Sequence, residues 1–475
     1  MYRIRIGGPI CRGNADPCDR LCHCFLFDVR VVAYYTSSMF HRLKQFVPEP
    51  LLQIYHYCLA RLACVWYGNP SDELIVIGVT GTNGKTTTSY LISKALEASG
   101  FKTGCTTTGI WKIGDTETIN TMKMTMPGRF FLQRMLRQMV TAGCRYAVIE
   151  TSSQGLIQYR HIGINYDVAV FTNLRPEHIE AHGGFENYKR AKRILFEHLV
   201  SGRVKVIDGT RIEKQAVLNA DSAHALYYAE TPGLTRVEWF SIDEQKGLVG
   251  ESIVLQGDGS RFVVEGKTVD LKLPGRYNVE NALAALAVCK ALGVSPQAAA
   301  ERVSMITRVP GRFERVDVGQ PFTVIVDYAP EPGSLQQLYE ALSLIPHRRV
   351  IHVLGSAGGG RDVARRAVLG QLAGQKADIV IVTNEDPYDD DPQQIIDQVA
   401  AGAQEFGKKE GETLFRIMNR REAIEKAMQL AHAQDLVVMT GKGCEAWICV
   451  AGGKKIPWDE VAVAREAIRK VTSNS

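Results

Sequence analysis

The sequence predicts an α/β protein that contains two sheets, and three observations lead to this prediction. Short apolar runs rich in β-branched residues alternate with helix-length segments. The first of these runs leads into a glycine-rich loop and then into a helical pattern. A second series of such runs begins after Gly311, so the boundary between the two sheets is expected near Thr307–Gly311.

Composition narrows the class of protein. With 45% hydrophobic and 23% charged residues among 475, the chain has the composition of a globular protein of several domains. A net charge of +5, from 56 basic and 51 acidic residues, is too small to indicate a nucleic-acid partner. The 11 cysteines form no disulfide framework, which favours a cytoplasmic location. No uncharged apolar run is long enough to span a membrane.

Residues 1–38 differ from the rest of the chain and show no helical period. A zinc site is one interpretation of their clustered ligand-type residues, Cys11, Cys18, Cys22, His23 and Cys24. Their spacing lacks the paired knuckles of such sites, so we expect a disordered extension, or a misassigned start with Met39 as the first residue.

The segment 39–72 is expected to form an N-terminal helix and a linker. Apolar residues dominate positions 51–67, and Gly68-Asn69-Pro70 ends the pattern. The helix is expected to pack on the following domain. The alternative is peripheral contact of residues 51–67 with a membrane interface.

Two series of buried strands follow. In the segment 73–308, expected to be a central domain, they are Leu74–Val79, Tyr146–Ile149 and Val168–Phe171. In the segment 309–475, expected to be a C-terminal domain, they are Thr323–Val326, Val350–Leu354, Ile379–Val382 and Leu436–Met439.

The loop after the first strand has the composition of a phosphate-binding loop. It reads Thr80-Gly81-Thr82-Asn83-Gly84-Lys85-Thr86-Thr87 and opens a helix, whose N-terminal amides bind phosphate oxygens. Lys85 is expected to reach the β- and γ-phosphates of ATP, and Thr86 to reach Mg2+. Val79 stands where the general motif has its first glycine, so the loop departs from that motif.

The loop resembles that of the Mur ligases, and further segments extend the resemblance over residues 73–475 in the right order. These segments are Glu150-Thr151-Ser152-Ser153, Phe171-Thr172-Asn173, Glu177-His178, Glu186-Asn187-Tyr188, Ala191-Lys192-Arg193, Leu273-Pro274-Gly275-Arg276-Tyr277-Asn278-Val279-Glu280-Asn281, Val309-Pro310-Gly311-Arg312 and Asp327-Tyr328-Ala329. The chain is most similar to the members that add the third residue of a cell-wall stem peptide. The resemblance implies a P-loop ATPase domain followed by a Rossmann-like ligase domain.

The resemblance implies an ATP-dependent amide ligase that activates a carboxylate as an acyl phosphate. Thr86, Glu150 and His178 would hold Mg2+, and Lys192 would be an N6-carboxylysine that helps to hold a second metal ion. The alternative for Lys192 is an ordinary surface lysine on a helix. In the same way, Lys85 and Arg312 would contact the phosphates during catalysis.

Further site residues follow from the same resemblance. Asn278 and Asn281 would contact the adenine, although capping of their helix is the alternative. Asp327 would bind the ribose. Residues assigned to substrate binding are Thr125, Ser152, Ser153, Arg361, Glu385, Asp386, Tyr388, Gly441 and Glu445, among which Arg361 would bind the α-carboxylate of the incoming amino acid.

The family's selectivity motif, Asp-Asn-Pro-Arg, is replaced here by Glu385-Asp386-Pro387-Tyr388. In relatives that use diaminopimelate, the arginine binds the distal carboxylate. An acidic pocket without that arginine argues for a basic diamino acid such as lysine or ornithine. The alternative is that Asp389-Asp390-Asp391 only caps the next helix.

The family's N-terminal domain, which binds uridine diphosphate, has no counterpart in the short stretch Met39–Glu73. We therefore expect the donor, a cell-wall precursor peptide, to be held differently, or not to be a UDP-sugar peptide at all. A folylpolyglutamate-synthase-like or cyanophycin-type ligase and an inactive nucleotide-binding regulator remain the alternative functions. The protein is expected to be a monomer.

Overall fold

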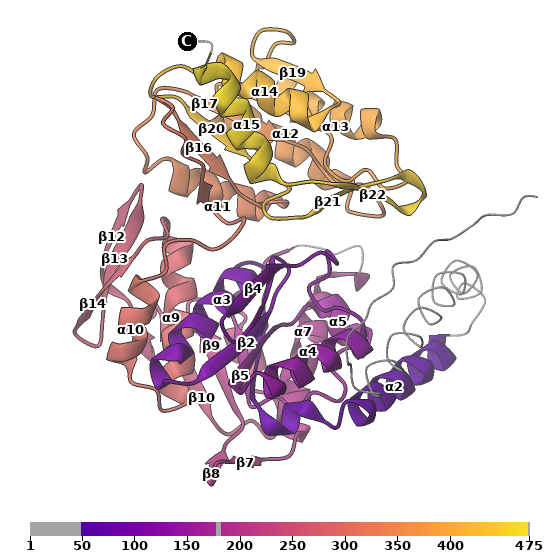
Figure 1. Cartoon of the computed structure of the whole chain (residues 1–475), viewed down its shortest axis with the longest axis vertical. Helices are drawn as coiled ribbons and strands as arrows, with labels where there is room; N and C mark the ends of the chain where they lie inside the picture. The colour runs from indigo at the N-terminus through magenta and orange to yellow at the C-terminus, as the bar shows by residue number, and fades with distance from the viewer. Residues whose placement is uncertain (1–48, 177–181, 474–475) are drawn as a thin grey trace, which may run out of the picture. The chain divides into compact units, whose positions relative to one another are not determined.

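The computed structural model describes residues 49–176 and 182–473 (Figure 1). The chain divides into two compact units, Met1–Cys58 and Leu59–Ser475. The candidate zinc ligands and the whole segment 1–38 lie outside the described residues, as does His178.

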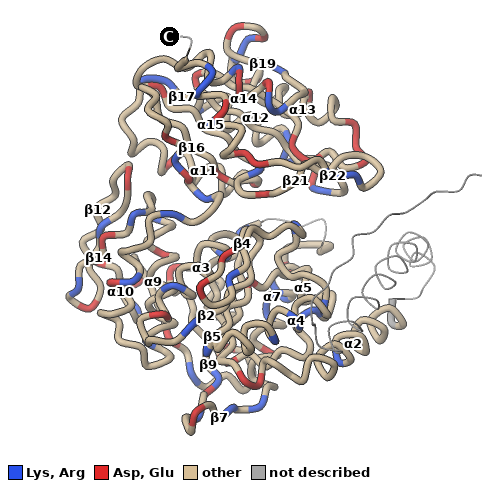
Figure 2. Tube along the Cα trace, in the orientation of Figure 1, with Lys and Arg blue, Asp and Glu red and all other residues tan. Residues whose placement is uncertain are grey.

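The predicted N-terminal helix is present as α2, Glu49–Trp66, and few of its residues are charged (Figure 2). In its last two turns Ala60, Ala63 and Cys64 are buried, and the Cys64 thiol donates to the carbonyl of Gly163 at 3.2 Å. The prediction that this helix packs on the following domain is therefore confirmed for these turns. Trp66 remains 74% exposed. None of the helices within the described ranges has the length and apolarity that crossing a membrane requires.

The first large sheet has nine strands in the order β11-β10-β9-β6-β1-β5-β2-β3-β4. The strands from β11 to β2 pair in parallel, whereas β2, β3 and β4 are antiparallel. Their bounds are β1 Ile75–Thr80, β2 Lys102–Thr106, β3 Ile110–Ile113, β4 Thr116–Ile119, β5 Cys144–Glu150, β6 Val168–Phe171, β9 Gln215–Asn219, β10 Val237–Ser241 and β11 Leu248–Val249.

Helices cover both faces of this sheet, which explains why every residue of β1 is buried. Ile75, Ile77 and Val79 join a core with α3 and α9, whereas Leu74 and Val76 join a core with α4 and α7. Figure 1 shows α9 and α10 on one side of the strands and α4, α5 and α7 on the other. The helices are α3 Lys85–Leu96, α4 Arg129–Thr141, α5 Ser153–Ile157, α7 Phe185–Ser201, α8 Ala225–Ala229, α9 Arg276–Ala291 and α10 Pro296–Ser304.

The second large sheet has six strands in the order β15-β16-β20-β17-β18-β19, and all pair in parallel except β15 with β16. Its strands are β15 Glu314–Arg315, β16 Thr323–Val326, β17 Val350–Leu354, β18 Ile379–Thr383, β19 Leu414–Ile417 and β20 Leu436–Met439. One face packs on α11 Pro332–Leu342, α12 Ala364–Lys376 and α13 Pro392–Gln404, and the other on α14 Arg420–Leu430 and α15 Glu460–Thr472.

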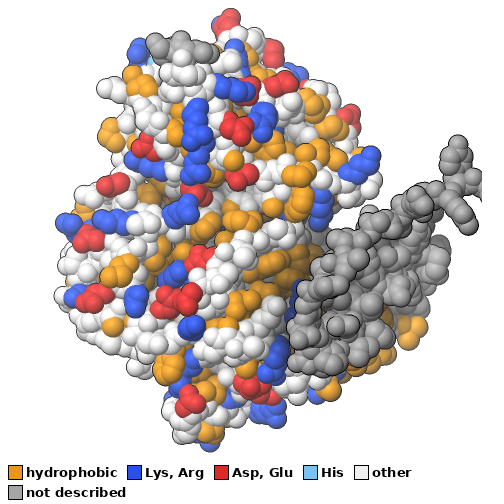
Figure 3. All heavy atoms as spheres, in the orientation of Figure 1, with side chains coloured by type: hydrophobic (Ala, Val, Ile, Leu, Met, Phe, Trp, Pro, Cys, Tyr) orange, Lys and Arg blue, Asp and Glu red, His pale blue; other side chains and the backbone are white. Residues whose placement is uncertain are grey.

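Smaller antiparallel elements complete the fold. A three-stranded sheet consists of β12 Glu251–Gln256, β13 Gly259–Val264 and β14 Lys267–Leu271. Two ribbons consist of β7 Lys205–Ile207 with β8 Thr210–Ile212, and of β21 Trp447–Val450 with β22 Lys454–Pro457. On the face visible in Figure 3, basic and acidic side chains are interspersed.

Candidate active site

The predicted phosphate loop joins β1 to α3, and two glycines fix its shape. Gly84 precedes α3 with φ +81°, and a Cβ there would lie 2.3 Å from Oδ1 of Asn281. A Cβ on Gly81 would lie 1.9 Å from Oγ1 of Thr172. Glycine is required at both positions because any side chain would collide with a neighbouring residue.

Hydrogen bonds to the segment after β6 hold this loop. The amide of Thr82 donates to the carbonyl of Asn173 at 2.9 Å, and the amide of Asn83 donates to Oδ1 of Asn173 at 2.9 Å. Nζ of Lys85 donates to the carbonyl of Thr82 at 2.7 Å. The N-terminus of α3 and the Lys85 ammonium therefore lie together, an arrangement that suits a polyphosphate.

Oxygen atoms suitable for Mg2+ lie beside the loop. Oγ1 of Thr86 donates to Oε2 of Glu150 at 3.0 Å, and Thr108 donates to the same carboxylate through its amide at 2.7 Å and its hydroxyl at 3.0 Å. Hard oxygen ligands are those that Mg2+ prefers, so Thr86 and Glu150 fit this ion. Within the described ranges, no group of three or more His, Cys, Asp or Glu side chains is placed to hold a metal.

Lys192 is not a surface lysine, so that alternative is wrong. Its residue is 1% exposed, Nζ donates to the carbonyl of Gly81 at 2.7 Å, and Nζ lies 4.2 Å from the centre of the Tyr188 ring. The α7 helix thus brings this ammonium group against the phosphate loop. Burial and the nearby Lys192 lower the pKa of His182.

The residues assigned to adenosine border a second pocket next to the loop, which contains Asn278, Asn281, Arg312 and Asp327. Asn281 accepts a hydrogen bond from the Thr88 hydroxyl at 3.0 Å, and Asn278 donates to the carbonyl of Pro274 at 2.8 Å. Burial raises the pKa of Asp327, although the Arg312 guanidinium opposes this. Nη2 of Arg312 donates to Oγ1 of Thr86 at 3.1 Å, so this arginine reaches the phosphate loop from outside the first sheet.

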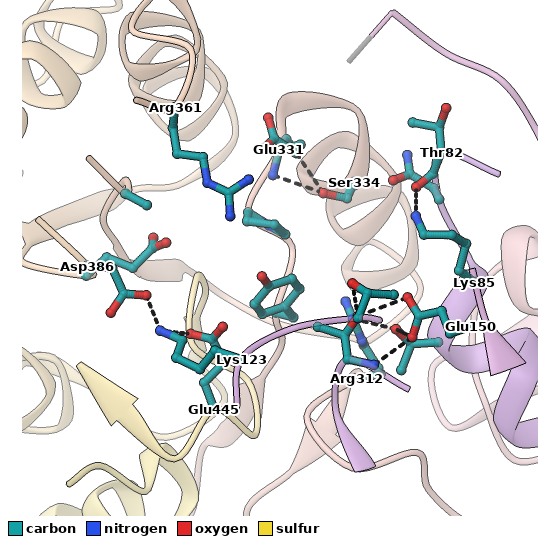
Figure 4. Close-up of a pocket in the computed structure, with 18 of the residues that line it drawn as sticks. Thr82, Lys85, Lys123, Glu150, Arg312, Glu331, Ser334, Arg361, Asp386 and Glu445 are labelled. Atoms are coloured by element: carbon teal, nitrogen blue, oxygen red, sulfur yellow. Dashed lines mark hydrogen bonds and ion pairs between the residues drawn. The ribbon is translucent and has the colours of Figure 1, made fainter. Parts of the chain in front are cut away.

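One pocket joins the phosphate loop to most of the residues assigned to the amino acid. The members of its lining that the sequence predicts are Thr82, Asn83, Gly84, Lys85, Thr86, Thr87, Thr125, Glu150, Arg312, Arg361, Glu385, Asp386, Tyr388 and Glu445. Figure 4 shows the Arg361 guanidinium directed into this pocket. Burial raises the pKa of Glu385 to about 7, so this carboxyl is largely uncharged below neutral pH.

The expected acidic character of the pocket is wrong. Asp386 and Glu445 both form ion pairs with Lys123 and with Lys442. Nζ of Lys442 lies 3.0 Å from Asp386 and 2.8 Å from Glu445. Two ammonium groups thus balance the two carboxylates, which removes the charge argument for lysine or ornithine.

The alternative for the acidic run, that it only caps the next helix, holds for Asp391 alone. Oδ1 of Asp391 accepts from the Gln393 amide at 2.9 Å at the start of α13. Asp390 pairs with Arg366 at 3.0 Å, and Asp389 accepts from the Gly452 amide at 2.8 Å. These three carboxylates cap and brace neighbouring segments.

Some assigned residues do not border this pocket. Ser152 caps α5 by accepting from the Gly155 amide at 3.1 Å, and Ser153 lies 3.1 Å from Nε2 of His182. A Cβ on Gly441 would lie 2.2 Å from Oε2 of Glu385, so this glycine makes room for that side chain. Residues of the lining that the sequence did not indicate include Thr108 and Lys123, which belong to no recognisable motif.

Comparisons with known proteins agree with this geometry. The family described as Mur ligase middle domain matches residues 79–289, and the family described as Mur ligase, glutamate ligase domain matches residues 311–443. The chain is 40% identical to UDP-N-acetylmuramyl-tripeptide synthetase of Roseiflexus sp. over 90% of this chain and 85% of that protein.

Two further relatives have more specific names. The chain is 38% identical to UDP-N-acetylmuramoyl-L-alanyl-D-glutamate--2,6-diaminopimelate ligase of Geobacillus kaustophilus, over 89% of this chain and 85% of that protein. A solved structure of a ligase with the same name is 30% identical with a TM-score of 0.55, covering 84% of this chain and 79% of that one.

Proposed function

Because this chain belongs to the Mur ligase family, we propose that it is an ATP-dependent ligase that adds a diamino acid to UDP-N-acetylmuramoyl-L-alanyl-D-glutamate. The names of its relatives make 2,6-diaminopimelate the first candidate for that amino acid. The observation that carries the proposal is a single pocket lined by both Lys85 of the phosphate loop and Arg361.

The reaction needs a leaving group on the donor carboxylate, and ATP with Mg2+ supplies it by forming an acyl phosphate. Lys85 and Arg312 offset the negative charge of the phosphates, since both side chains reach the loop. Thr86 and Glu150 offer oxygen ligands to Mg2+. Arg361 lines the same pocket and would bind the α-carboxylate of the amino acid. The α-amine would then attack the acyl carbon and release phosphate.

The finer part of the proposal concerns Lys192, which we assign as an N6-carboxylysine. Its burial against the carbonyl of Gly81 supports a role at the phosphate loop. Carbamylation would convert this ammonium into an anion that can bind a second Mg2+ together with His178.

The proposed substrates are cytoplasmic cell-wall precursors, so we propose a cytoplasmic location. We also propose that the active form is a monomer. The proposed domain bounds remain 73–308 and 309–475.

A coupled assay of phosphate release, with mass spectrometry of the product, tests the proposed function. We expect release only when Mg-ATP, UDP-N-acetylmuramoyl-L-alanyl-D-glutamate and a diamino acid are all present, and a product heavier by one amino-acid residue. Turnover with a folate and glutamate would instead support a folylpolyglutamate-synthase-like activity. Nucleotide binding without turnover on any donor would support an inactive regulator.

A further inference from the structure

We propose that Lys123 recognises the distal carboxylate of 2,6-diaminopimelate, and that this makes the enzyme select an amino acid whose far end is zwitterionic. The inference rests on the proposed function and names the residue that determines its choice of amino acid.

Lys123 belongs to the irregular segment between β4 and α4, yet its ammonium contacts residues in the C-terminal part of the chain, namely Asp386, Glu445 and Trp447. Its ammonium pairs with Glu445 at 2.8 Å and also with Asp386 (Figure 4). The side chain is 7% exposed and belongs to the lining of the pocket that contains Arg361 and Tyr388. Its own backbone has φ +53°, a conformation that L-residues adopt rarely.

A neighbouring contact holds the segment in place. Nε1 of Trp447 donates to the carbonyl of Thr121 at 2.9 Å, and Nζ of Lys123 donates to the carbonyl of Trp447 at 3.3 Å. Both contacts are with Trp447, so this residue of β21 holds the segment beside Lys123.

The charges at this end of the pocket are balanced before an amino acid enters. The ammonium groups of Lys123 and Lys442 face the carboxylates of Asp386 and Glu445. Arg361 has no ion pair with a described residue and can bind an α-carboxylate. Burial raises the pKa of Glu385 to about 7, so near neutral pH this carboxyl is partly protonated and carries less than a full negative charge.

This balance favours an amino acid whose distal end carries both an ammonium and a carboxylate group. The distal ammonium of diaminopimelate can take the place of Lys123 against Asp386 and Glu445, while Lys123 turns to the distal carboxylate. The total charge of the pocket stays unchanged. Lysine would bring a third ammonium to two carboxylates, and an unpaired charge in a desolvated site is strongly unfavourable. The uncharged side chain of Tyr388 cannot form an ion pair with the distal ammonium or the distal carboxylate.

Lys123 is better placed for this exchange than Lys442. Lys442 is fully buried and donates to Asp386, to Glu445 and, at 2.7 Å, to the carbonyl of Trp447. It is absent from the lining of the pocket, whereas Lys123 belongs to it. Lys442 therefore holds the two carboxylates, and Lys123 can exchange partners.

The test is the ratio of kcat/KM for diaminopimelate to that for lysine, measured slightly below neutral pH on the full chain. In Lys123→Met the pocket keeps two carboxylates and one ammonium, so the ratio should fall by about thirtyfold or more in favour of lysine. Lys123→Arg should retain the preference for diaminopimelate. An unchanged ratio in Lys123→Met would overturn the proposal.

Lys112→Met is the matched control. Lys112, on β3, is likewise a buried lysine with an ion pair, to Glu97 at 2.6 Å, but it does not border the pocket. A change there can lower both kcat/KM values through folding, but it should leave their ratio unchanged. A similar shift of the ratio in Lys112→Met would show that the effect of Lys123→Met is only structural, and would also overturn the proposal.

A second measurement needs no variant. The unaltered enzyme should prefer diaminopimelate to both lysine, which lacks the distal carboxylate, and 2-aminopimelate, which lacks the distal amine. Equal or better use of lysine would overturn the role of Lys123 while leaving the ligase activity intact. Absence of ligation with all three amino acids would instead contradict the proposed function itself.

Discussion

The side chain of Lys192 is buried, and its ammonium group donates to the carbonyl of Gly81 in the phosphate loop. If its proposed carbamate is required, Lys192→Ala should abolish ligation, and acetate or another short carboxylate should restore part of the activity by supplying the missing negative charge. Phosphate release with and without acetate measures this effect.

Lys189→Ala is the control for Lys192→Ala. Lys189 lies on the same helix, but its ammonium faces Glu186 at 3.7 Å and the ring of Tyr227. This variant should keep its activity and should not respond to acetate. Full activity of Lys192→Ala without acetate would contradict the family mechanism for this chain.

The carboxyl of Glu385 should make stability depend on pH. Burial raises its pKa to about 7 in the folded state, above the unfolded value, so its stabilising contribution is complete below the unfolded pKa and is lost as the pH rises through about 7. Glu385→Gln removes this dependence. Between acidic pH and pH above 7, the Tm of the wild type should therefore fall by about 5 °C relative to that of the variant.

Thermal unfolding across this pH range tests the prediction, with Glu412→Gln as a control. The Glu412 side chain is 69% exposed, so its replacement should leave the pH profile of the wild type unchanged. Parallel profiles for the wild type and Glu385→Gln would show that Glu385 is already ionised in the folded state.

At the scale of elements, the loop between β1 and α3 allows two effects of an added side chain to be separated. One is backbone strain, and the other is a steric clash with a neighbouring residue. Gly84 and Gly100 have nearly the same φ, +81° and +82°, but a Cβ on Gly100 would have nothing within 4 Å. Gly100→Ala should cost about 1–2 kcal/mol of strain and leave nucleotide binding intact. Gly84→Ala should also push Asn281 away and weaken ATP binding by at least about tenfold.

Titration with a fluorescent ATP analogue measures both affinities. Equal affinities in the two variants would mean that the loop accommodates a side chain against Asn281, and that the close approach of α9 is not needed for binding.

Elements that are apolar on both faces could be predicted well from the sequence. The runs Val168–Phe171, Thr323–Val326, Val350–Leu354 and Leu436–Met439 are the observed β6, β16, β17 and β20, because buried parallel strands leave a continuous apolar signal. The strands β4 and β12 were not predicted. Every residue of β4 is exposed, and β12 alternates only weakly, so neither leaves such a signal.

The residues of the site also differ in whether the sequence alone could identify them. Residues within local motifs, such as Lys85 and Glu150, could be assigned because their neighbours in the sequence identify them. The charge balance around Asp386 could not, because its partner Lys123 is 263 residues away and belongs to no motif. Counting acidic residues in one segment therefore predicted the wrong charge for the pocket.

At the scale of the whole molecule, the nucleotide should be held by residues from both large sheets. Arg312 precedes the second sheet, yet it donates to Thr86 at the start of α3. Mg-ATP should therefore raise the Tm of the wild type, and much less so that of Arg312→Ala, because a ligand stabilises only the state that binds it. Differential scanning fluorimetry with and without Mg-ATP measures the two shifts.

Arg315→Ala serves as the control for this prediction. Arg315 is an exposed arginine of β15 that contacts the carbonyl of Gly257 at 3.5 Å, away from the pocket. Its Tm shift with Mg-ATP should equal that of the wild type. Equal shifts for Arg312→Ala and Arg315→Ala would show that the phosphate loop binds ATP without help from the second sheet.

The α9 helix links the packing of the first domain to its catalytic pocket. Eleven of its 16 residues are buried, including Ala282, Ala284, Ala285 and Ala287, while Asn278 and Asn281 border the nucleotide pocket. A larger side chain in place of one of these buried alanines must displace the helix, because the packed interior has no space for it. Substitution of these alanines should therefore give heat-sensitive mutants. Such mutants should lose their affinity for ATP at a temperature at which the chain is still folded.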